Sequence, residues 1–201
     1  ARKYFGSIPA QEPPQAIRTV EPEQLGERRL LIEVDAPTPL LHVAFHAGNA
    51  TDPRTLPLNV LLNILVGGNS SRLHQVLVEQ EQLALAIGGF QMEGFDPGLV
   101  YFYLTLPPDA DVAVVEGRLL DELNRVATDG VTEAELAKAR NIMIADYWRS
   151  LATINGKAAT LGGAEVFFGD YQDAFALPGK LEQVSAEQIQ AVAGDIFNRK
   201  R

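Results

Sequence analysis

The amino-acid sequence predicts an α+β fold, in which a mostly antiparallel β-sheet is backed by helices. The first observation is the order of the elements, ββααββ followed by a helical half, because the strands come in pairs instead of alternating singly with helices. The second is that 46% of the 201 residues are hydrophobic. That content is enough to bury a core and too high for a disordered segment.

Residues 1–27 are expected to be a lead-in from a preceding domain, and residues 28–201 a single α+β half-domain. The opening Ala1–Pro9 is typical of the end of a helix followed by a linker, so we expect a fragment or a processed chain. Proline fixes the backbone and donates no hydrogen bond, which prevents regular structure over most of the lead-in. The prolines concerned are Pro9, Pro13, Pro14 and Pro22.

The half-domain begins with two β-type runs, Arg29–Val34 and Leu40–Ala47, which Pro37 and Pro39 separate. A strongly apolar helix is predicted next, over Leu56–Val66. Its apolar residues recur at helical spacing on one face, namely at Leu58, Leu61, Leu62 and Leu65.

A second helix is predicted over roughly Ser71–Gln80, because apolar residues recur there at spacings of three and four. The first helix ends at two glycines, and Asn69 or Ser70 is expected to cap the second. We therefore expect a structural turn between two antiparallel helices, built from Gly67, Gly68, Ser70, Ser71 and Arg72.

Two further strands, Leu83–Phe95 and Leu99–Leu106, flank the hairpin signal Asp96-Pro97-Gly98. In the second strand, apolar or aromatic residues stand at both odd and even positions, so that they point to both faces of the sheet. Val100 and Phe102 belong to one face, whereas Tyr101 and Tyr103 belong to the other. Either both faces are covered, or one of them is a binding wall.

The remaining chain is predicted to be helical. An amphipathic helix spans Asp111–Thr128, and a capping box from Thr132 to Glu135 opens a long helix that ends near Leu151. A further helix over Ala158–Phe168 is expected to break near Gly162-Gly163. Ser185 and Gln188 repeat the capping pattern ahead of a buried stripe formed by Ile189, Val192 and Ile196.

Composition excludes several functions. There are 17 Lys+Arg against 26 Asp+Glu, a formal charge of −9, which argues against nucleic acid or an anionic membrane as partner. The sequence has no cysteine, which excludes disulfides and thiolate metal sites. It has no run of about 20 apolar residues, the length that a membrane span requires. The cellular compartment, periplasmic or cytoplasmic, stays open at this point.

His42 and His46 form the most suggestive metal-like pattern, because histidines at i and i+4 on a helix can share a zinc ion. Here they lie in a β-type run, where their Cα atoms would be about 13 Å apart. Phe45 stands where H-x-x-E-H has its glutamate, and it cannot transfer a proton. We therefore expect both histidines to be structural.

Other candidate sites are weaker. The run from Gly67 to Arg72 follows a helix and contains no lysine, so it is not a phosphate-binding loop. Ser70 does not stand in the G-x-S-x-G pattern of serine hydrolases. The carboxylates Asp121, Glu122, Glu133 and Glu135 are expected to be surface charges on helices.

Residues Leu65–Leu77, continuing to Ile87, resemble the C-terminal, non-catalytic domain of bacterial pitrilysin/insulinase-type zinc metallopeptidases, relatives of the processing peptidases. The shared features are a helix ending in glycines, a Ser-Ser-Arg-Leu start and a following Glu/Ala/Leu run. The lead-in and Gly130–Arg140 also fit, so that the resemblance extends over nearly the whole chain. It implies an α+β half-domain, paired with a second half in one chain and often with a second subunit.

The resemblance also implies which functional residues this half lacks. In the family, zinc is held by H-x-x-E-H on the first helix of a catalytic half, but Leu56–Val66 contains neither His nor Glu. An Arg and a Tyr seven residues apart hold the substrate, and their positions are occupied here by Val78 and Leu85. Apolar side chains cannot donate hydrogen bonds to a substrate carbonyl. The substrate clamp is therefore expected to be lost.

The leading hypothesis is a non-catalytic half-domain in the peptide-binding chamber of a zinc endopeptidase, with Tyr101 and Tyr103 as possible chamber wall. No cofactor is expected in this chain, and zinc is expected in the N-terminal catalytic half of the parent or in a partner. The expected partners are that half, a homologous second subunit and unfolded peptide. The alternatives are a structural subunit of an inactive processing-peptidase-like complex and a stand-alone peptide-binding module.

Overall fold

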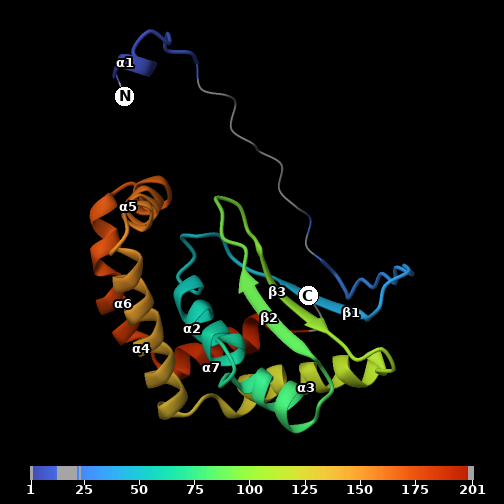
Figure 1. The fold of residues 1–201 in the computed structure, drawn as a ribbon. Helices are drawn as coiled ribbons and strands as arrows, with labels where there is room; N and C mark the ends of the chain where they lie inside the picture. Colours follow the sequence, from blue (N-terminus) through green and yellow to red (C-terminus); the bar gives the residue numbers. More distant parts are fainter. Residues whose placement is uncertain (1, 13–21, 23, 199–201) are drawn as a thin grey trace.

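The computed structural model describes residues 2–12, 22 and 24–198. The prolines at positions 13 and 14 of the expected lead-in lie outside the described residues. Figure 1 shows the elements in chain order. They are α1 (Arg2–Phe5), β1 (Leu40–His46), α2 (Thr55–Val66), η1 (His74–Gln80), β2 (Ala86–Gln91), β3 (Leu99–Thr105), α3 (Val112–Asp129), α4 (Glu133–Ser150), α5 (Ile154–Phe168), η2 (Tyr171–Ala176), α6 (Leu177–Gln183) and α7 (Ala186–Ile196).

The three strands form one antiparallel sheet in the order β1-β3-β2. The β2–β3 pair is the predicted hairpin, with Ala86 opposite Thr105 and Gln91 opposite Val100. Strand β1 pairs with the other side of β3, with Leu40 opposite Thr105. Both β1 and β2 are therefore edge strands among the described residues. The sheet confirms the antiparallel α+β fold class.

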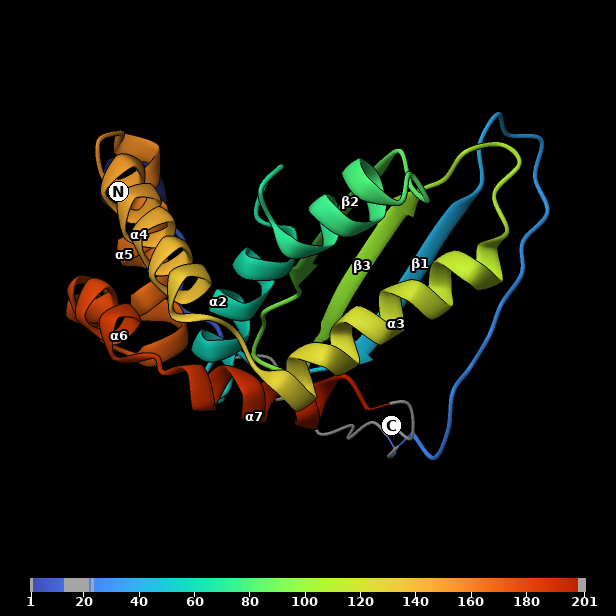
Figure 2. The ribbon, with the colours of Figure 1, turned by 90° about the horizontal axis from the view of Figure 1, so that it is seen from below.

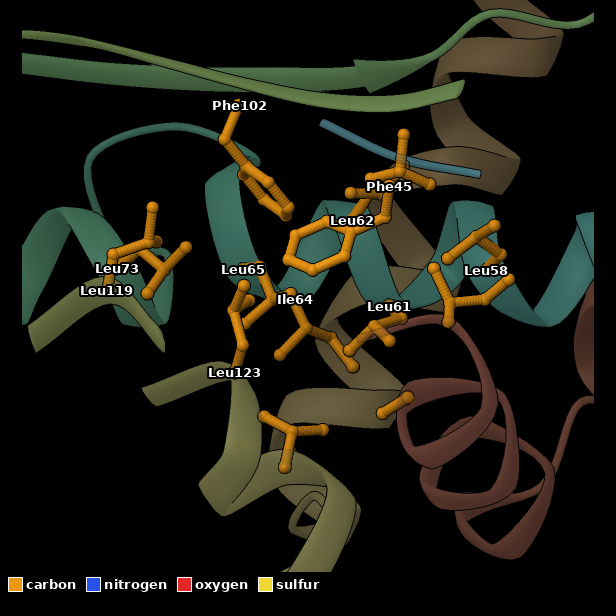
Figure 3. Close-up of a cluster of buried hydrophobic side chains, with 14 of the residues drawn as sticks. Phe45, Leu58, Leu61, Leu62, Ile64, Leu65, Leu73, Phe102, Leu119 and Leu123 are labelled. Carbon is orange, nitrogen blue, oxygen red and sulfur yellow. The ribbon is translucent and has the colours of Figure 1, made fainter. Parts of the chain in front are cut away.

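One face of the sheet carries the hydrophobic core. Phe45 from β1 and Phe102 from β3 point toward Leu61 and Leu65 of α2, and Leu123 of α3 closes the cluster from below (Figure 3). Seen from below, α2 and α3 lie in front of the sheet (Figure 2). The predicted apolar stripes of α2 and α7 are buried in this cluster, and so is that of α3 apart from Val112, which is 39% exposed. Core formation thus follows from the helical and strand periods of the sequence.

The second half of the chain forms a helical arm beside the sheet. In Figure 1, α4, α5 and α6 stand to the left of the strands, and α4 packs against α2. Helix α4 begins at the predicted capping box, in which Thr132 accepts from the backbone of Glu135 while the Glu135 side chain accepts from Thr132. Helix α7 begins at the equivalent box of Ser185 and Gln188. No described helix is long and apolar enough to cross a bilayer.

The first predicted strand, Arg29–Val34, is not a strand in the structure. Its apolar residues remain in water, with Leu31 85% and Ile32 68% exposed. Its contact with the rest of the fold is an ion pair instead, in which Arg29 donates to both carboxylate oxygens of Glu116 on α3. A β-type pattern describes a side-chain surface suited to a sheet, but a strand also requires a neighbouring edge. Among the described residues β1 pairs with β3 alone, so this run is not paired with the free edge of β1.

Three helical details also differ from expectation. Helix α5 runs through Gly162-Gly163 without a break and begins earlier than predicted, at Ile154. Its N-cap is Thr153, whose hydroxyl accepts from the Gly156 amide. The segment after the glycine turn is a π-helix with no side-chain cap, so that neither Asn69 nor Ser70 caps it. The helices η2 and α6 were not predicted, because they are short and lack a long apolar stripe.

Candidate functional site

The face of the sheet that points away from the core carries a cluster of aromatic rings. Four aromatic residues share this outer face and alternate with buried or half-buried residues: His42 of β1, Phe90 of β2, and Tyr101 and Tyr103 of β3. Ring centroids lie 5.4 Å apart for His42 and Tyr101, and 5.6 Å apart for Phe90 and Tyr101. Phe90 and Tyr103 are 48% and 44% exposed. We call these four residues the aromatic face.

A glycine shapes the aromatic face. A Cβ atom on Gly88 would lie 2.2 Å from the hydroxyl oxygen of Tyr103 and 2.3 Å from its Cζ. Gly88 is opposite Tyr103 in the β2–β3 register, so the missing side chain lets the Tyr103 ring cross the neighbouring strand. The aromatic rings therefore extend over all three strands as a low, contiguous apolar surface with a hydroxyl at its edge.

A groove runs between the inner side of β2 and the helix α2. Its volume is about 310 Å³. It is lined by Asn59, Leu62, Asn63, Val66, Gly67, Gly89 and Met143. Asn59 donates to Glu93 over 2.6 Å, whereas the side-chain oxygen of Asn63 is buried without a hydrogen-bond partner. The groove thus combines an apolar lining with two carboxamides one helical turn apart.

The turn from Gly67 to Arg72 lies between α2 and η1. Gly68 has φ of 88°, a left-handed conformation that favours glycine. Arg72 donates from Nε and a terminal nitrogen to the two oxygens of Glu135, over 2.9 and 2.7 Å. Lys138 donates to the carbonyl oxygen of Ser70 over 2.7 Å. These contacts fasten the turn to the beginning of α4, and the Ser71 hydroxyl is buried beneath it.

Glu135 combines two structural tasks. Burial alone would raise the pKa of its carboxyl, but hydrogen bonds from Arg72 and Thr132 outweigh burial and hold that pKa below its ordinary value.

Glu122 on α3 is not the surface charge that the sequence predicts. It is 2% exposed and accepts from Arg118 over 2.7 Å and from Arg125 over 3.1 Å. A carboxylate can be buried on α3 because two guanidinium groups neutralise it.

The two suspected clamp positions lie on either side of the loop between η1 and β2. Val78 is half-buried and packs against the core, while Leu85 is 55% exposed. The Leu85 amide donates to the carbonyl oxygen of Thr105, at the beginning of the β2–β3 hairpin. Neither side chain carries a donor for a substrate carbonyl.

The structure does not bring the two histidines together at a metal site. The His42 ring contacts the hydroxyl of Tyr101, whereas the Nε2 atom of His46 lies 3.1 Å from the side-chain oxygen of Gln24. In the described part of the chain, no cluster of three or more His, Cys, Asp or Glu side chains could hold a metal ion. The third histidine, His74, lies on η1, and its nearest carboxylate is Glu79 at 3.8 Å.

Sequence reasoning missed parts of both surfaces. Phe90 was placed within a predicted strand, but its alignment with Tyr101 depends on the hairpin register. The groove had a visible signal: Asn59 and Asn63 are the only polar residues between Leu56 and Val66, and they are four apart. On a helix that spacing places both side chains on one face. The role of Gly88 had no comparable signal, because it depends on a side chain across the sheet.

The class of the protein, a non-catalytic peptidase domain, is shown by its family. The chain belongs to the family described as the Peptidase M16 inactive domain, whose family model matches residues 1–143. This match confirms the non-catalytic, metallopeptidase-type identity that the sequence resemblance predicts.

Named relatives agree with this family. An uncharacterized zinc protease of Mycobacterium tuberculosis is 32% identical over 145 residues, which are 71% of this chain and 32% of that protein. The uncharacterized zinc protease YmxG of Bacillus subtilis is 24% identical over 195 residues, 97% of this chain and 47% of that protein. The chain therefore spans about a third to a half of the length of these relatives.

Solved structures show the same fold. A protease from Helicobacter pylori has a TM-score of 0.89 at 21% identity, with 99% of this chain and 49% of that chain covered. The peptidase M16 inactive domain from Pseudomonas fluorescens has a TM-score of 0.73 at 18% identity, with 84% and 40% covered.

Proposed function

We propose that this chain is the non-catalytic half of a zinc endopeptidase and that its aromatic face forms part of the wall of the peptide-binding chamber. The half-domain begins near residue 28 in this proposal, and residues 1–27 join it to the catalytic half. The zinc ion and the residues that activate water belong to that other half. The observation that carries the proposal is the exposed aromatic face, because a monomeric domain rarely leaves such a cluster in water without a function.

Aromatic side chains suit a wall that must hold unfolded peptides of many sequences. Each ring offers a large rigid contact area, and a tyrosine also has a hydroxyl that can donate or accept. Tyr103 has both properties and is 44% exposed. A chamber wall of this kind would position a peptide for cleavage without taking part in the chemistry.

The positions of Val78 and Leu85 support a division of labour between subunits. If they occupy the clamp positions, these two side chains supply no donor to the substrate backbone. A homologous second subunit would then supply the Arg and Tyr. We expect the parent chain to hydrolyse peptides only together with that subunit, and an Arg→Ala change in the subunit to abolish the activity. Full activity of the parent alone would contradict this part of the proposal.

The chamber-wall proposal is tested in the full-length protein with its partner subunit. Tyr103→Ala removes one ring of the aromatic face, and Tyr171→Ala on η2 is the matched control because that tyrosine is 48% exposed outside the face. We expect Tyr103→Ala to raise KM for an unfolded casein about 2- to 10-fold, which corresponds to the free energy of one aromatic contact. Equal KM values for the two variants would contradict the chamber-wall role.

A structural subunit is the second candidate function. A chain of complex III from Candida albicans shares the fold, with a TM-score of 0.70 at 16% identity over 82% of this chain. In this alternative, as in that of a stand-alone peptide-binding module, the parent has no catalytic zinc. The presence of H-x-x-E-H in the rest of the parent protein, with one zinc ion per molecule by elemental analysis, distinguishes the peptidase from both.

A further inference from the structure

We infer that the outer face of helix α5 pairs with the same face of a second copy of this protein, in an antiparallel arrangement about a two-fold axis at Leu161. The contact would join two parent molecules through their helical arms. The inference does not depend on the chamber-wall proposal, because it uses neither the aromatic face nor the suspected clamp positions.

Helix α5 leaves most of its surface in water, although its residues are mostly apolar or small. Figure 1 shows it at the upper end of the helical arm, where it packs on η2 and α4. Within Ile154–Phe168 only Ala164 is buried, whereas Ile154 is 89% and Phe168 52% exposed. A helix without a polar face is normally covered by protein. The described residues of this chain do not cover it, so the partner lies outside them.

The outer face of α5 is self-complementary. Lys157 and Glu165, the only charged residues of the helix, stand four positions before and after Leu161. Ile154 and Phe168 stand seven positions before and after it. Positions offset by four and by seven lie on one face of a helix. When two such faces meet antiparallel at Leu161, Lys157 of one copy lies beside Glu165 of the other. Ile154 likewise meets Phe168, so that apolar surface is buried at both ends of the contact.

The two charges are available for this contact. Glu165 accepts from the main-chain amide of Tyr171 through one carboxylate oxygen, over 3.0 Å, which leaves its second oxygen for a lysine. Lys157 has no ion-pair partner in the described part of the chain. Each chain carries a net charge of −9, so that two copies repel at long range. Complementary charges at close quarters instead select a partner and fix its register.

Gly162 allows a second helix to approach closely. It is exposed beside Leu161, and a Cβ atom added there would meet nothing within 4 Å beyond the helix itself. Glycine is among the least favourable residues in a helix interior, and packing within the described chain does not require it here. Its missing side chain lets another backbone come near. The helix therefore gives up intrinsic stability next to the proposed two-fold axis.

The experiment measures self-association of the full-length protein by sedimentation equilibrium near neutral pH, from micromolar to submillimolar concentrations. A single helix pair buries less than a standard interface, so we expect a weak, reversible monomer–dimer equilibrium. In Lys157→Glu both unlike charge pairs become like pairs, and we expect the dissociation constant to rise at least about 10-fold. Arg28→Glu is the matched control. It changes the net charge equally at an exposed position outside the helix, and we expect it to associate like the wild type.

Mixing two single variants tests the antiparallel register. Glu165→Lys alone is also expected to associate weakly, because it places lysines of the two copies together. An equimolar mixture of Lys157→Glu and Glu165→Lys should recover the wild-type dissociation constant, since both unlike pairs are restored across the mixed dimer. Thermal melting of each variant establishes that it is folded, because Glu165→Lys also loses the hydrogen bond from Tyr171.

Gly162→Leu separates the contact between copies from folding. We expect its melting temperature to stay equal or rise, because leucine favours a helix and the site is open. We expect its dissociation constant to rise at least about 10-fold, because the added side chain holds the two helices apart. An unchanged dissociation constant in this variant would contradict a helix crossing at Leu161.

A full-length protein that stays monomeric throughout would overturn the inference, because the rest of the parent would then cover α5. A mixture of the two single variants that associates no better than either alone would also overturn it. So would an Arg28→Glu variant that is weakened as much as Lys157→Glu, since net charge would then explain both. Recovery of the dimer in the mixture, together with its loss in Gly162→Leu, would support the inference.

Discussion

Replacing Arg72 by Met is expected to destabilise the protein through a single ion pair at the turn between α2 and η1. Arg72 and Glu135 are linked by two hydrogen bonds, and their side chains are 19% and 29% exposed. Hydrogen bonds to charged groups contribute about 1.5–3 kcal/mol, and partial solvation reduces this. Met keeps the apolar stem of Arg. We therefore expect a loss of about 1–2 kcal/mol of unfolding free energy, which lowers the melting temperature by about 2–8 °C for a domain of this size.

The pH dependence of this loss follows from the carboxyl group. The folded-state pKa of Glu135 lies below its ordinary value of 4.5. A depressed pKa stabilises the folded protein fully above the ordinary value, and the stabilisation disappears as the pH falls through the folded-state pKa. The difference between Arg72→Met and the wild type is therefore expected at pH 7 and should shrink as the pH falls through the folded-state pKa. Below that pKa the carboxyl is protonated and no longer attracts the guanidinium.

The assay is urea unfolding at pH 7 and pH 3 for the wild type, Arg72→Met, Glu135→Gln and the double variant. A double-mutant cycle isolates the pair, and its coupling energy should be about 1 kcal/mol at pH 7 and smaller at pH 3. Arg149→Met is the control, because the Arg149–Asp146 pair is largely exposed and should contribute almost nothing. A coupling energy that is the same at both pH values would refute the reasoning.

Further outcomes can be measured on the same protein. Gly68→Val should cost about 1–3 kcal/mol by thermal unfolding, because a β-branched residue strains the left-handed turn; unchanged melting would contradict the turn. Gly117→Ala, in open space on α3, should instead stabilise by about 0.5–1 kcal/mol; a loss would show a hidden contact. Leu65→Ala should cost about 3–5 kcal/mol, since Leu65 is fully buried; under 1 kcal/mol would place it outside the core. Elemental analysis of this chain should find no stoichiometric zinc, and peptide assays should find no cleavage. One zinc ion per chain that is absent from the His42→Ala variant would overturn that expectation.

Local signals in the sequence were sufficient to predict the residues of the core and the positions of most helix ends. The apolar stripe of α2 and the capping box at Thr132 are patterns within one or two turns, and both are present in the structure. The prediction of a strand over Arg29–Val34 was wrong, because a strand depends on a partner strand that the run itself does not specify. The prediction of a helix break at Gly162-Gly163 was wrong, because two glycines lower helix propensity by an amount that the surrounding structure can offset.

The candidate surfaces were predictable only in part. Alternation placed Tyr101 and Tyr103 on one face of a strand, but the neighbours of that face come from the pairing of three strands. Glu122 was assigned to the surface because charge at a helix position usually means exposure. Its burial depends in part on Arg118, four residues earlier on α3, which also donates to Glu81 just after η1. The contact between Arg118 and Glu81, 37 residues apart, leaves no local trace in the sequence.

The exposed run from Leu30 to Val34 has a consequence for handling the protein. An apolar, β-prone segment without a sheet partner can pair with the same segment of another copy, which is how many aggregates begin. Two charges oppose this, Arg29 and Glu33, together with the net charge of −9, which makes copies repel one another near neutral pH. Acid removes that repulsion as carboxylates are protonated. Concentrated protein is therefore expected to precipitate as the net charge approaches zero, and the acid unfolding measurements require dilute samples.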